Sequence, residues 1–238
     1  MTSSRRGRSH LRLGFNDSTT TMFIGHFAVA FAGKKVAPNA PLPALLLGAL
    51  FADVLWPILV AIGAEHVRIV PGATVYTPLE FVSYPWSHSL LMLIIWGGLF
   101  AAYYRGRTDG RLTGWVVGAL VVSHWILDWI THRPDMPLWP GGPKYGLSLW
   151  NNVNATIAVE IAMFVAGVLL YATATRARDA AGRWGLWSLA ALLLATFVFD
   201  SFDRAPPPSI KALWITALIA TAVVVSWAGW VDRHRETA

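Results

Sequence analysis

Two imidazoles and a carboxylate recur at every fourth position in the stretch SHWILDWITH, residues 123–132. On an α-helix, residues four apart lie on one face, so His124, Asp128 and His132 form a single stripe. Neutral imidazole and carboxylate are common protein ligands of zinc, iron and manganese. The stripe therefore predicts a metal site.

The segment that carries this stripe is apolar around its whole circumference, from about residue 111 to 133. The whole chain has 238 residues, of which 55% are hydrophobic and only 13% are charged, against about 25% charged in average soluble proteins. The mean hydropathy is +0.49. Several apolar runs approach the length that crosses a bilayer, so we expect an integral membrane protein.

Three more ionisable residues lie in or beside apolar runs: His26, Asp53 and His88. Each alone is readily explained as a structural partner between helices, or as a cap in the case of His88. Together with the stripe they are costly to bury, which favours a shared site. The chain has no cysteine, so thiolate ligands are excluded. The predicted metal ligands are His26, Asp53, His88, His124 and Asp128.

The N-terminal residues 1–21 are polar and basic, and we expect a disordered tail there, with Met22 resembling a natural start. Residues 22–238 form one predicted transmembrane domain, which begins with a short helix over residues 22–32. That helix is too short to span, so it lies at the interface or dips into the bundle. A cleaved signal peptide is the rival interpretation of the basic start and the apolar run.

The predicted fold is all-α: a polytopic membrane bundle of about six transmembrane helices plus the short N-terminal helix. A kink is expected at Pro57 in the first span. The long loops over residues 64–87 and 133–152 are expected to cover the site. The predicted spans cover residues 41–63, 88–104, 112–132, 153–175, 184–199 and 211–231.

The net charge of +6 comes from Lys and Arg clusters between apolar runs, so we expect no direct nucleic-acid binding. By the positive-inside rule these clusters place both termini on the cytoplasmic side of the membrane. The basic residues assigned to the inner side are Lys34, Lys35, Arg105, Arg107, Arg111, Arg176, Arg178, Arg183, Arg233 and Arg235.

Four short motifs, in this order, resemble the YdjM-type family of membrane-bound metal-dependent hydrolases, also described as LexA-binding inner-membrane proteins. The family pattern is Gly-His, then G-x-L-x-P-D-x-D-x-P, H-R-x-x-T-H-S and S-H-x-x-x-D. The resemblance covers residues 22–135 and implies a bacterial-type inner membrane. The corresponding segments are Gly25-His26, GALFADVLWP with Asp53 and Pro57, SYPWSHSLL with His88 and Ser89, and SHWILDWIT with Ser123, His124 and Asp128.

The chain departs from this pattern at two potential ligands, because Leu55 replaces the second Asp and Ser83 the first His. Ala52 and Tyr84 also replace the family's Pro and Arg. We therefore expect a single metal rather than several. The residues that can restore a ligand from elsewhere are Glu160, His132 and Asp135.

The resemblance implies hydrolysis of an ester or phosphoester in a lipid-like substrate, with a divalent metal, most simply zinc, or else manganese or iron. Asp53 or Glu160 is the expected base, although Glu160 equally suits an interhelical hydrogen bond. We place Ser89, Ser123 and His132 beside the ligands, with His132 nearer the membrane interface. The competing functions are a transporter or metal-ion carrier and a non-catalytic membrane scaffold. The oligomeric state is left open.

Overall fold

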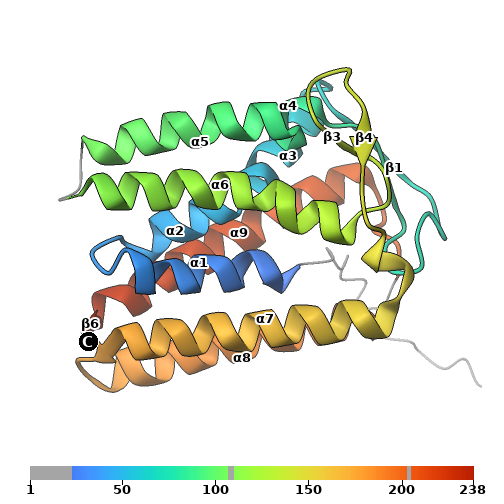
Figure 1. Cartoon of the computed structure of the whole chain (residues 1–238). Coiled ribbons are helices and arrows are strands. Elements are labelled where there is room, and N and C mark those ends of the chain that lie inside the picture. The colour runs from blue at the N-terminus through green and yellow to red at the C-terminus, as the bar shows by residue number, and fades with distance from the viewer. Residues whose placement is uncertain (1–22, 107–109, 203–204) are drawn as a thin grey trace, which may run out of the picture.

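The computed structural model describes residues 23–106, 110–202 and 205–238, so the predicted tail and Met22 lie outside the described residues. Helices dominate this part of the chain (Figure 1). The helices are α1 (Ile24–Val36), α2 (Leu42–Ala49), α3 (Phe51–Ala61), α4 (Pro85–His88), α5 (Leu90–Arg105), α6 (Arg111–Thr131), α7 (Val153–Ala174), α8 (Ala180–Phe202) and α9 (Ile210–Arg233), with a 3-10 turn η1 (Leu149–Asn151).

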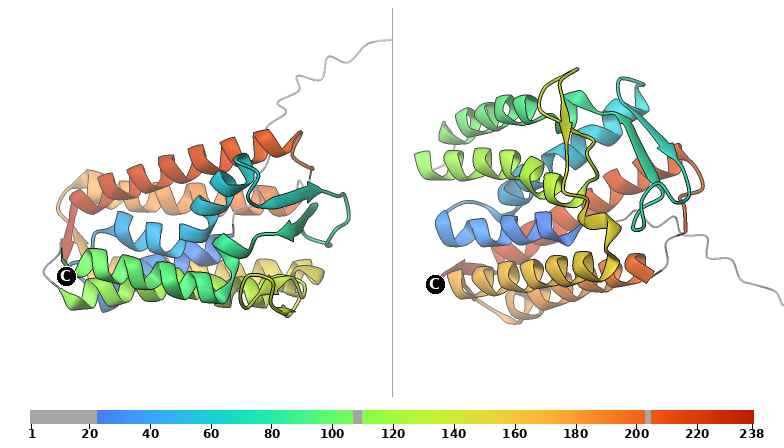
Figure 2. Two further views of the ribbon diagram at one scale, coloured as in Figure 1. Left: turned by 90° about the horizontal axis from the view of Figure 1, so that it is seen from above. Right: turned by 45° about the vertical axis from the view of Figure 1, so that its right-hand side comes forward.

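Short strands form three antiparallel pairs within the described residues. These are β1 (His66–Ile69) with β2 (Leu79–Ser83), β3 (Met136–Pro137) with β4 (Lys144–Tyr145), and β5 (Thr175–Ala177) with β6 (Arg235–Thr237). The first two pairs lie at one end of the bundle, and β6 lies at the opposite end beside the C-terminus (Figures 1 and 2). The two predicted loops thus gather at a single end of the molecule.

Four helices in the described part of the chain, α6 to α9, are long and apolar enough to cross a membrane. The pair α2 and α3 adds a fifth crossing if it is counted as one broken span. Helix α5 has only 16 residues, which at 1.5 Å per residue is about 24 Å and shorter than a hydrocarbon core of about 30 Å. The all-α membrane bundle is therefore confirmed, whereas the count of about six spans is not.

The first span is bent by 57° between α2 and α3. The bend lies at Leu50, whose backbone leaves the helical region at φ −97° and ψ 6°. Pro57, where we predicted the kink, instead lies inside α3. The last carbonyls of a helix lack partners in their own helix, and that of Ala49 receives a hydrogen bond from His124 of α6. The break thus presents a carbonyl oxygen that holds His124 of the stripe in place.

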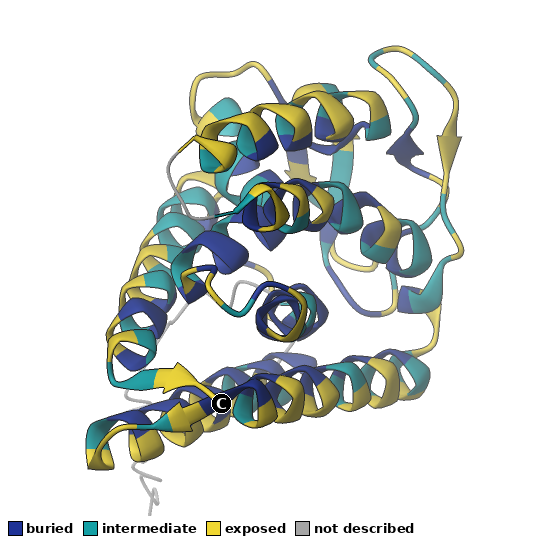
Figure 3. Ribbon diagram, turned by 60° about the vertical axis from the view of Figure 1, so that its left-hand side comes forward, coloured by how far each residue is buried: buried dark blue, intermediate teal, exposed yellow. Residues whose placement is uncertain are grey.

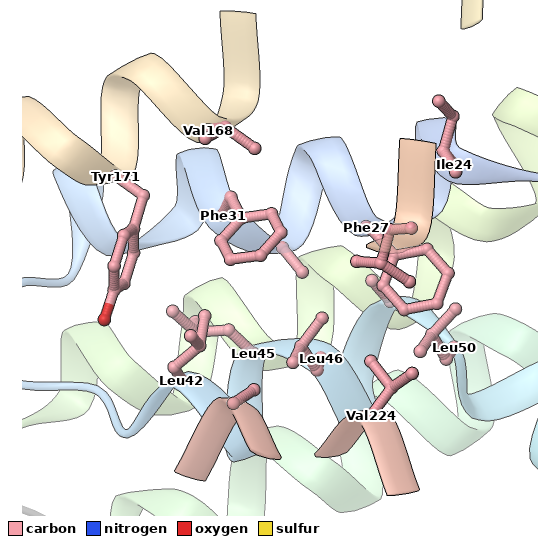
Figure 4. Packing of buried hydrophobic residues seen from close by; sticks show 14 of the residues in the cluster. Ile24, Phe27, Phe31, Leu42, Leu45, Leu46, Leu50, Val168, Tyr171 and Val224 are labelled. Carbon is pink, nitrogen blue, oxygen red and sulfur yellow. The ribbon is translucent and has the colours of Figure 1, made fainter. Parts of the chain in front are cut away.

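Helix α1 dips into the bundle, where it packs against α7, α2 and α6. Its Phe27 and Phe31 are almost fully buried; Phe31 lies toward Leu45 and Leu46 of α2, and Phe27 toward Leu50 (Figure 4). Exposed residues line the outward faces of the long helices, and buried residues gather in the interior (Figure 3). Burial of α1 places its first turn, with His26, at the centre of the molecule.

Candidate metal centre

All five predicted ligands come together in the structure, although they arise from four helices. His26 lies in the first turn of α1, Asp53 follows the break at the start of α3, and His88 ends α4. The stripe on α6 supplies His124 and Asp128, which are both buried. The N-terminus of α1, the break before α3 and the short α4 therefore position these side chains against the stripe.

The carboxylate of Asp128 is the meeting point of the imidazoles. Its Oδ2 lies 3.2 Å from Nε2 of His124 and 3.6 Å from Nε2 of His88, and its Oδ1 lies 3.3 Å from Nε2 of His26. Oδ1 of Asp53 lies 3.7 Å from His124 Nε2 and 3.9 Å from His88 Nε2. Six ligand atoms from five residues in distant parts of the sequence thus face one small volume.

These separations suit a divalent cation. Ligand atoms about 2.0–2.1 Å from a tetrahedral zinc ion lie about 3.4 Å from one another. The four distances from His88 and His124 to the two carboxylates range from 3.2 to 3.9 Å. Among the described residues, the trios that can hold a metal are His26, His124 and Asp128, and Asp53, His88 and His124. His124 belongs to both trios.

Unpaired buried nitrogens support the same conclusion. Nε2 of His124 and both ring nitrogens of His26 are buried and make no hydrogen bond within the part of the chain that the structure describes. A buried polar atom without a partner is costly, and coordination to a cation removes that cost. The donor set of imidazole and carboxylate therefore fits a metal.

The tautomer of His124 follows from its second nitrogen. Nδ1 lies 2.8 Å from the carbonyl oxygen of Ala49, and a carbonyl only accepts, so Nδ1 carries the proton. In the neutral ring, Nε2 then keeps its lone pair and faces Asp128 and Asp53. This is the arrangement in which metal-binding histidines are usually held.

His88 is held by a relay that the sequence did not reveal. Oγ of Ser87 donates to Oε2 of Glu65 at 2.6 Å and lies 2.7 Å from Nδ1 of His88. Because the single hydroxyl proton goes to Glu65, Nδ1 of His88 must donate to Ser87, which leaves Nε2 free to bind. Oε1 of Glu65 accepts from the backbone N–H groups of Trp86 and Ser87, at 2.8 and 2.9 Å. Glu65 is 1% exposed.

A carboxylate orients His132 in the same way. Nδ1 of His132 lies 3.0 Å from Oδ1 of Asp135, and Nε2 lies 3.9 Å from Oδ2 of Asp128. The ring is 4% exposed and packs 4.1 Å from the ring of Trp150. The loop that follows α6 folds back over the end of the helix and buries this ring, and the position of His132 near the membrane interface stays a prediction.

The surroundings of Asp135 keep it charged. Burial alone would raise the pKa of its carboxyl group, but hydrogen bonds from His132, Tyr84 and Arg133 outweigh burial and lower the pKa below its ordinary value. Burial and the neighbouring Asp135 raise the pKa of the Tyr84 phenol well above its ordinary value. Tyr84 therefore stays protonated and donates to Asp135 at 2.9 Å.

Three other predicted site residues make bonds away from the cluster. Glu160 of α7 accepts from the backbone N–H of Gly25 at 2.6 Å, which is the interhelical bond we had set beside its role as a base. Oγ of Ser89 accepts from Met92 N at 3.4 Å and caps α5, and Oγ of Ser123 donates to Leu120 O at 2.8 Å within α6. Glu160 thus holds the start of α1, and with it His26.

Sequence reasoning missed Glu65, Ser87 and the role of Tyr84. Tyr84 stood out only as a departure from the family pattern, and Ser87 directly precedes the predicted ligand His88. Glu65 lies in a mixed loop 23 residues before His88 and has no spacing that would connect the two. Only the fold brings it there.

A cavity of about 900 Å³, counted with the open space at its mouth, adjoins the cluster. His26, Asp53, His88, Asp128 and His132 form one part of its wall, and apolar residues form most of the remainder. The side chain of Asp53 is 47% exposed, whereas that of Asp128 is only 6% exposed. Asp53 is therefore the carboxylate that a molecule entering the cavity meets.

Comparison with family models gives a match to the one described as YdjM inner membrane protein, over residues 17–231. Neither the comparison with curated proteins nor that with solved structures gives a match. The matched segment extends well beyond the four motifs and includes all the residues of the cluster.

Proposed function

The chain belongs to the YdjM inner membrane protein family, and on that basis we propose that it is a membrane-embedded, metal-dependent hydrolase. The proposed substrate is an ester or phosphoester of a lipid-like molecule that reaches the cavity from the bilayer. The observation that carries the proposal is the convergence of imidazole Nε2 atoms and two carboxylates beside an apolar cavity.

We assign the metal ligands as His88, His124, Asp128 and Asp53, with His26 completing or adjoining the set. Zinc is the simplest cation for these ligands, and manganese or iron also accept them. Among the residues that could replace a ligand missing from the family pattern, His132 is the best supported, because its Nε2 faces Asp128 and its Nδ1 is held by Asp135. Glu160 is engaged with the backbone of α1, so we no longer favour it as the base.

A bound divalent cation would lower the pKa of water and polarise the ester oxygen of a substrate. Asp53 is the proposed general base, because its half-exposed carboxylate faces the cavity and accepts a proton from water there. Asp128, contacted by the imidazoles, holds the ligand set together. The apolar walls exclude bulk water, which strengthens the electrostatic interactions within the site.

The test is metal analysis by mass spectrometry on detergent-purified protein, with His124→Ala and Asp128→Asn as variants. Loss of stoichiometric metal and of lipid-ester or phosphoester hydrolysis in both variants supports the proposal. Ser226→Ala, at an exposed polar position on α9, serves as the control and is expected to keep both the bound metal and the hydrolytic activity. A full metal complement in His124→Ala would overturn the ligand assignment.

A metal-ion carrier is the second candidate, favoured by one observation. Transporters often bind ions at helices broken within the membrane, and Asp53 lies directly after the 57° break at Leu50. Metal flux into proteoliposomes, abolished by Asp53→Asn, would support the carrier. A non-catalytic scaffold with a structural metal would instead show neither flux nor turnover and would lose thermal stability when stripped of metal.

The orientation in the membrane remains a proposal. Apart from Arg107, which lies outside the described residues, the basic residues assigned to the inner side lie at helix ends or in turns at the end of the bundle that carries the C-terminus, opposite the β1–β2 and β3–β4 hairpins (Figure 1). We propose that this basic end is cytoplasmic and that the cavity opens toward the other side. Cysteine accessibility at Gly141 and at Arg178 would test it, since reagents that do not cross membranes should label only the former in intact cells.

A further inference from the structure

The cavity beside the cluster has two chemically different parts. One part carries the imidazoles and carboxylates described above. The other part is apolar apart from two threonines. Aromatic residues such as Phe27, Phe81 and Trp150 and one face of α9 line this second part. A ligand that fills both parts must have a polar or charged end and an apolar body.

One wall of the apolar part is a single face of α9. Leu213, Ala217, Ala220 and Thr221 follow the i, i+4, i+7, i+8 spacing of one helical face. Two of these residues are alanines, so the wall lies close to the helix backbone and leaves space that larger side chains would fill. Large aromatic side chains, among them Trp56 and Trp150, line the cavity as well.

The same helix also borders the membrane. Ile219 and Val223 of α9 are 59% and 53% exposed, as lipid-facing residues are in a protein that lies in a bilayer. Helix α9 thus has the cavity on one side and lipid on the other. An apolar chain from a membrane lipid therefore has only the width of this helix to pass before it reaches the cavity.

We propose that the α9 wall, residues Leu213, Ala217, Ala220 and Thr221, is an acyl-chain subsite. The inference rests on the proposed function, since the ester or phosphoester of the same lipid would then lie at the His/Asp cluster. Burial of each further CH₂ group of such a chain raises affinity about fourfold, so even part of a chain supplies strong binding. A compact polar substrate would leave this wall without a partner.

The experiment uses the full chain in detergent and two probes with a diazirine in the acyl chain, a photoactivatable palmitic acid and a photoactivatable phosphatidic acid. After irradiation, labelled peptides are located by mass spectrometry. We expect labelling on α9 and on the facing aromatic residues. Labelling by the phosphatidic acid identifies a glycerophospholipid as the source of the chain, and labelling by palmitic acid alone identifies a free fatty acid.

Filling the wall should remove the label. Ala220→Phe and, independently, Ala217→Phe are expected to reduce labelling within the cavity at least about fivefold, since they displace several CH₂ groups. Ala222→Phe is the matched control, because Ala222 is exposed on the same helix and does not line the cavity. Cavity labelling that persists in both Ala217→Phe and Ala220→Phe would overturn the subsite.

The same samples separate the two proposals. Bound metal is measured in each variant, and we expect Ala217→Phe and Ala220→Phe to retain it, since α9 supplies none of the proposed ligands. Labelling is repeated after chelator treatment, so the subsite is tested even if the protein binds no metal at all. Cavity labelling in a protein that binds no metal would support the subsite and contradict the proposed hydrolase. Bound metal without cavity labelling would contradict the subsite and leave the proposed hydrolase in place.

Discussion

Replacing Glu65 by Gln should weaken metal binding although Glu65 touches no metal ligand directly. In the structure, Oε1 of Glu65 accepts two backbone N–H groups and Oε2 accepts the Ser87 hydroxyl proton. In Glu65→Gln, the amide oxygen must take the position of Oε1, because the backbone groups only donate. The amide NH₂ then points at Ser87 and donates to its Oγ.

This change reverses the whole relay. The Ser87 hydroxyl, now an acceptor from Gln, turns its proton toward Nδ1 of His88, which must accept it. The remaining proton of a neutral His88 then sits on Nε2, the nitrogen that faces Asp128 and Asp53. Substitutions in such outer partners of metal-binding histidines typically cost 10–100-fold in affinity. We expect a loss in this range, or about 1.4–2.7 kcal/mol.

The assay is a zinc competition titration against a chromophoric chelator with detergent-purified protein. Ser87→Ala should lose less affinity than Glu65→Gln, because it removes the relay without imposing the wrong tautomer. Glu236→Gln, a half-exposed carboxylate on β6 at the other end of the bundle, controls for the loss of one negative charge. An affinity of Glu65→Gln within about twofold of wild type would refute the reasoning, since even weak outer-partner effects exceed it.

Three further results are expected. Removing metal with a chelator should lower the melting temperature by several degrees, because the buried Asp128 then loses the cation that compensates its burial; an unchanged melting curve would argue against a bound metal. Asp135 has a lowered pKa in the fold, so it stabilises the protein above about pH 3.9 and loses this effect as the pH falls through its folded pKa. The stability difference between wild type and Asp135→Asn, measured by thermal unfolding, should therefore shrink toward acid and would contradict this assignment if it grew. Lys34→Met should cost about 3 kcal/mol, because it leaves Asp232, 2.9 Å from the buried Lys34, without its charge partner, and Lys35→Met on the exposed side of α1 should cost far less in the same unfolding assay.

The membrane class and the gathering of the five candidate ligands could be predicted, because both depend largely on local sequence. A long apolar run predicts by itself that the segment lies in a membrane or a core. The i, i+4 spacing of His124 and Asp128 places both side chains on one face of the helix, wherever that helix packs. The cost of burying His26, Asp53 and His88 apart then made one shared site the simpler hypothesis. The structure brings all of these residues together.

What escaped prediction depends on contacts between distant segments. Pro57 suggested the kink, yet the chain bends at Leu50, where the carbonyl of Ala49 is bonded by a histidine 75 residues away. The burial of His132 requires the following loop to fold back over the end of α6, which no periodicity encodes. The predicted span over residues 88–104 corresponds to α5 within two residues at each end, but its 16 residues are fewer than a membrane crossing needs, so the apolar character alone overstated it.

The central position of α1 has a consequence for how the protein is assembled. Its first turn is bonded to Glu160, which lies 135 residues later in the chain, and the helix packs along α7. A close fit is built in, since a side chain at Gly167 would collide with the backbone of Ala28. During synthesis, α1 therefore cannot complete its packing until α7 has emerged from the ribosome. His26 is accordingly among the last of the proposed ligands to reach its final position, although it is the first to be translated.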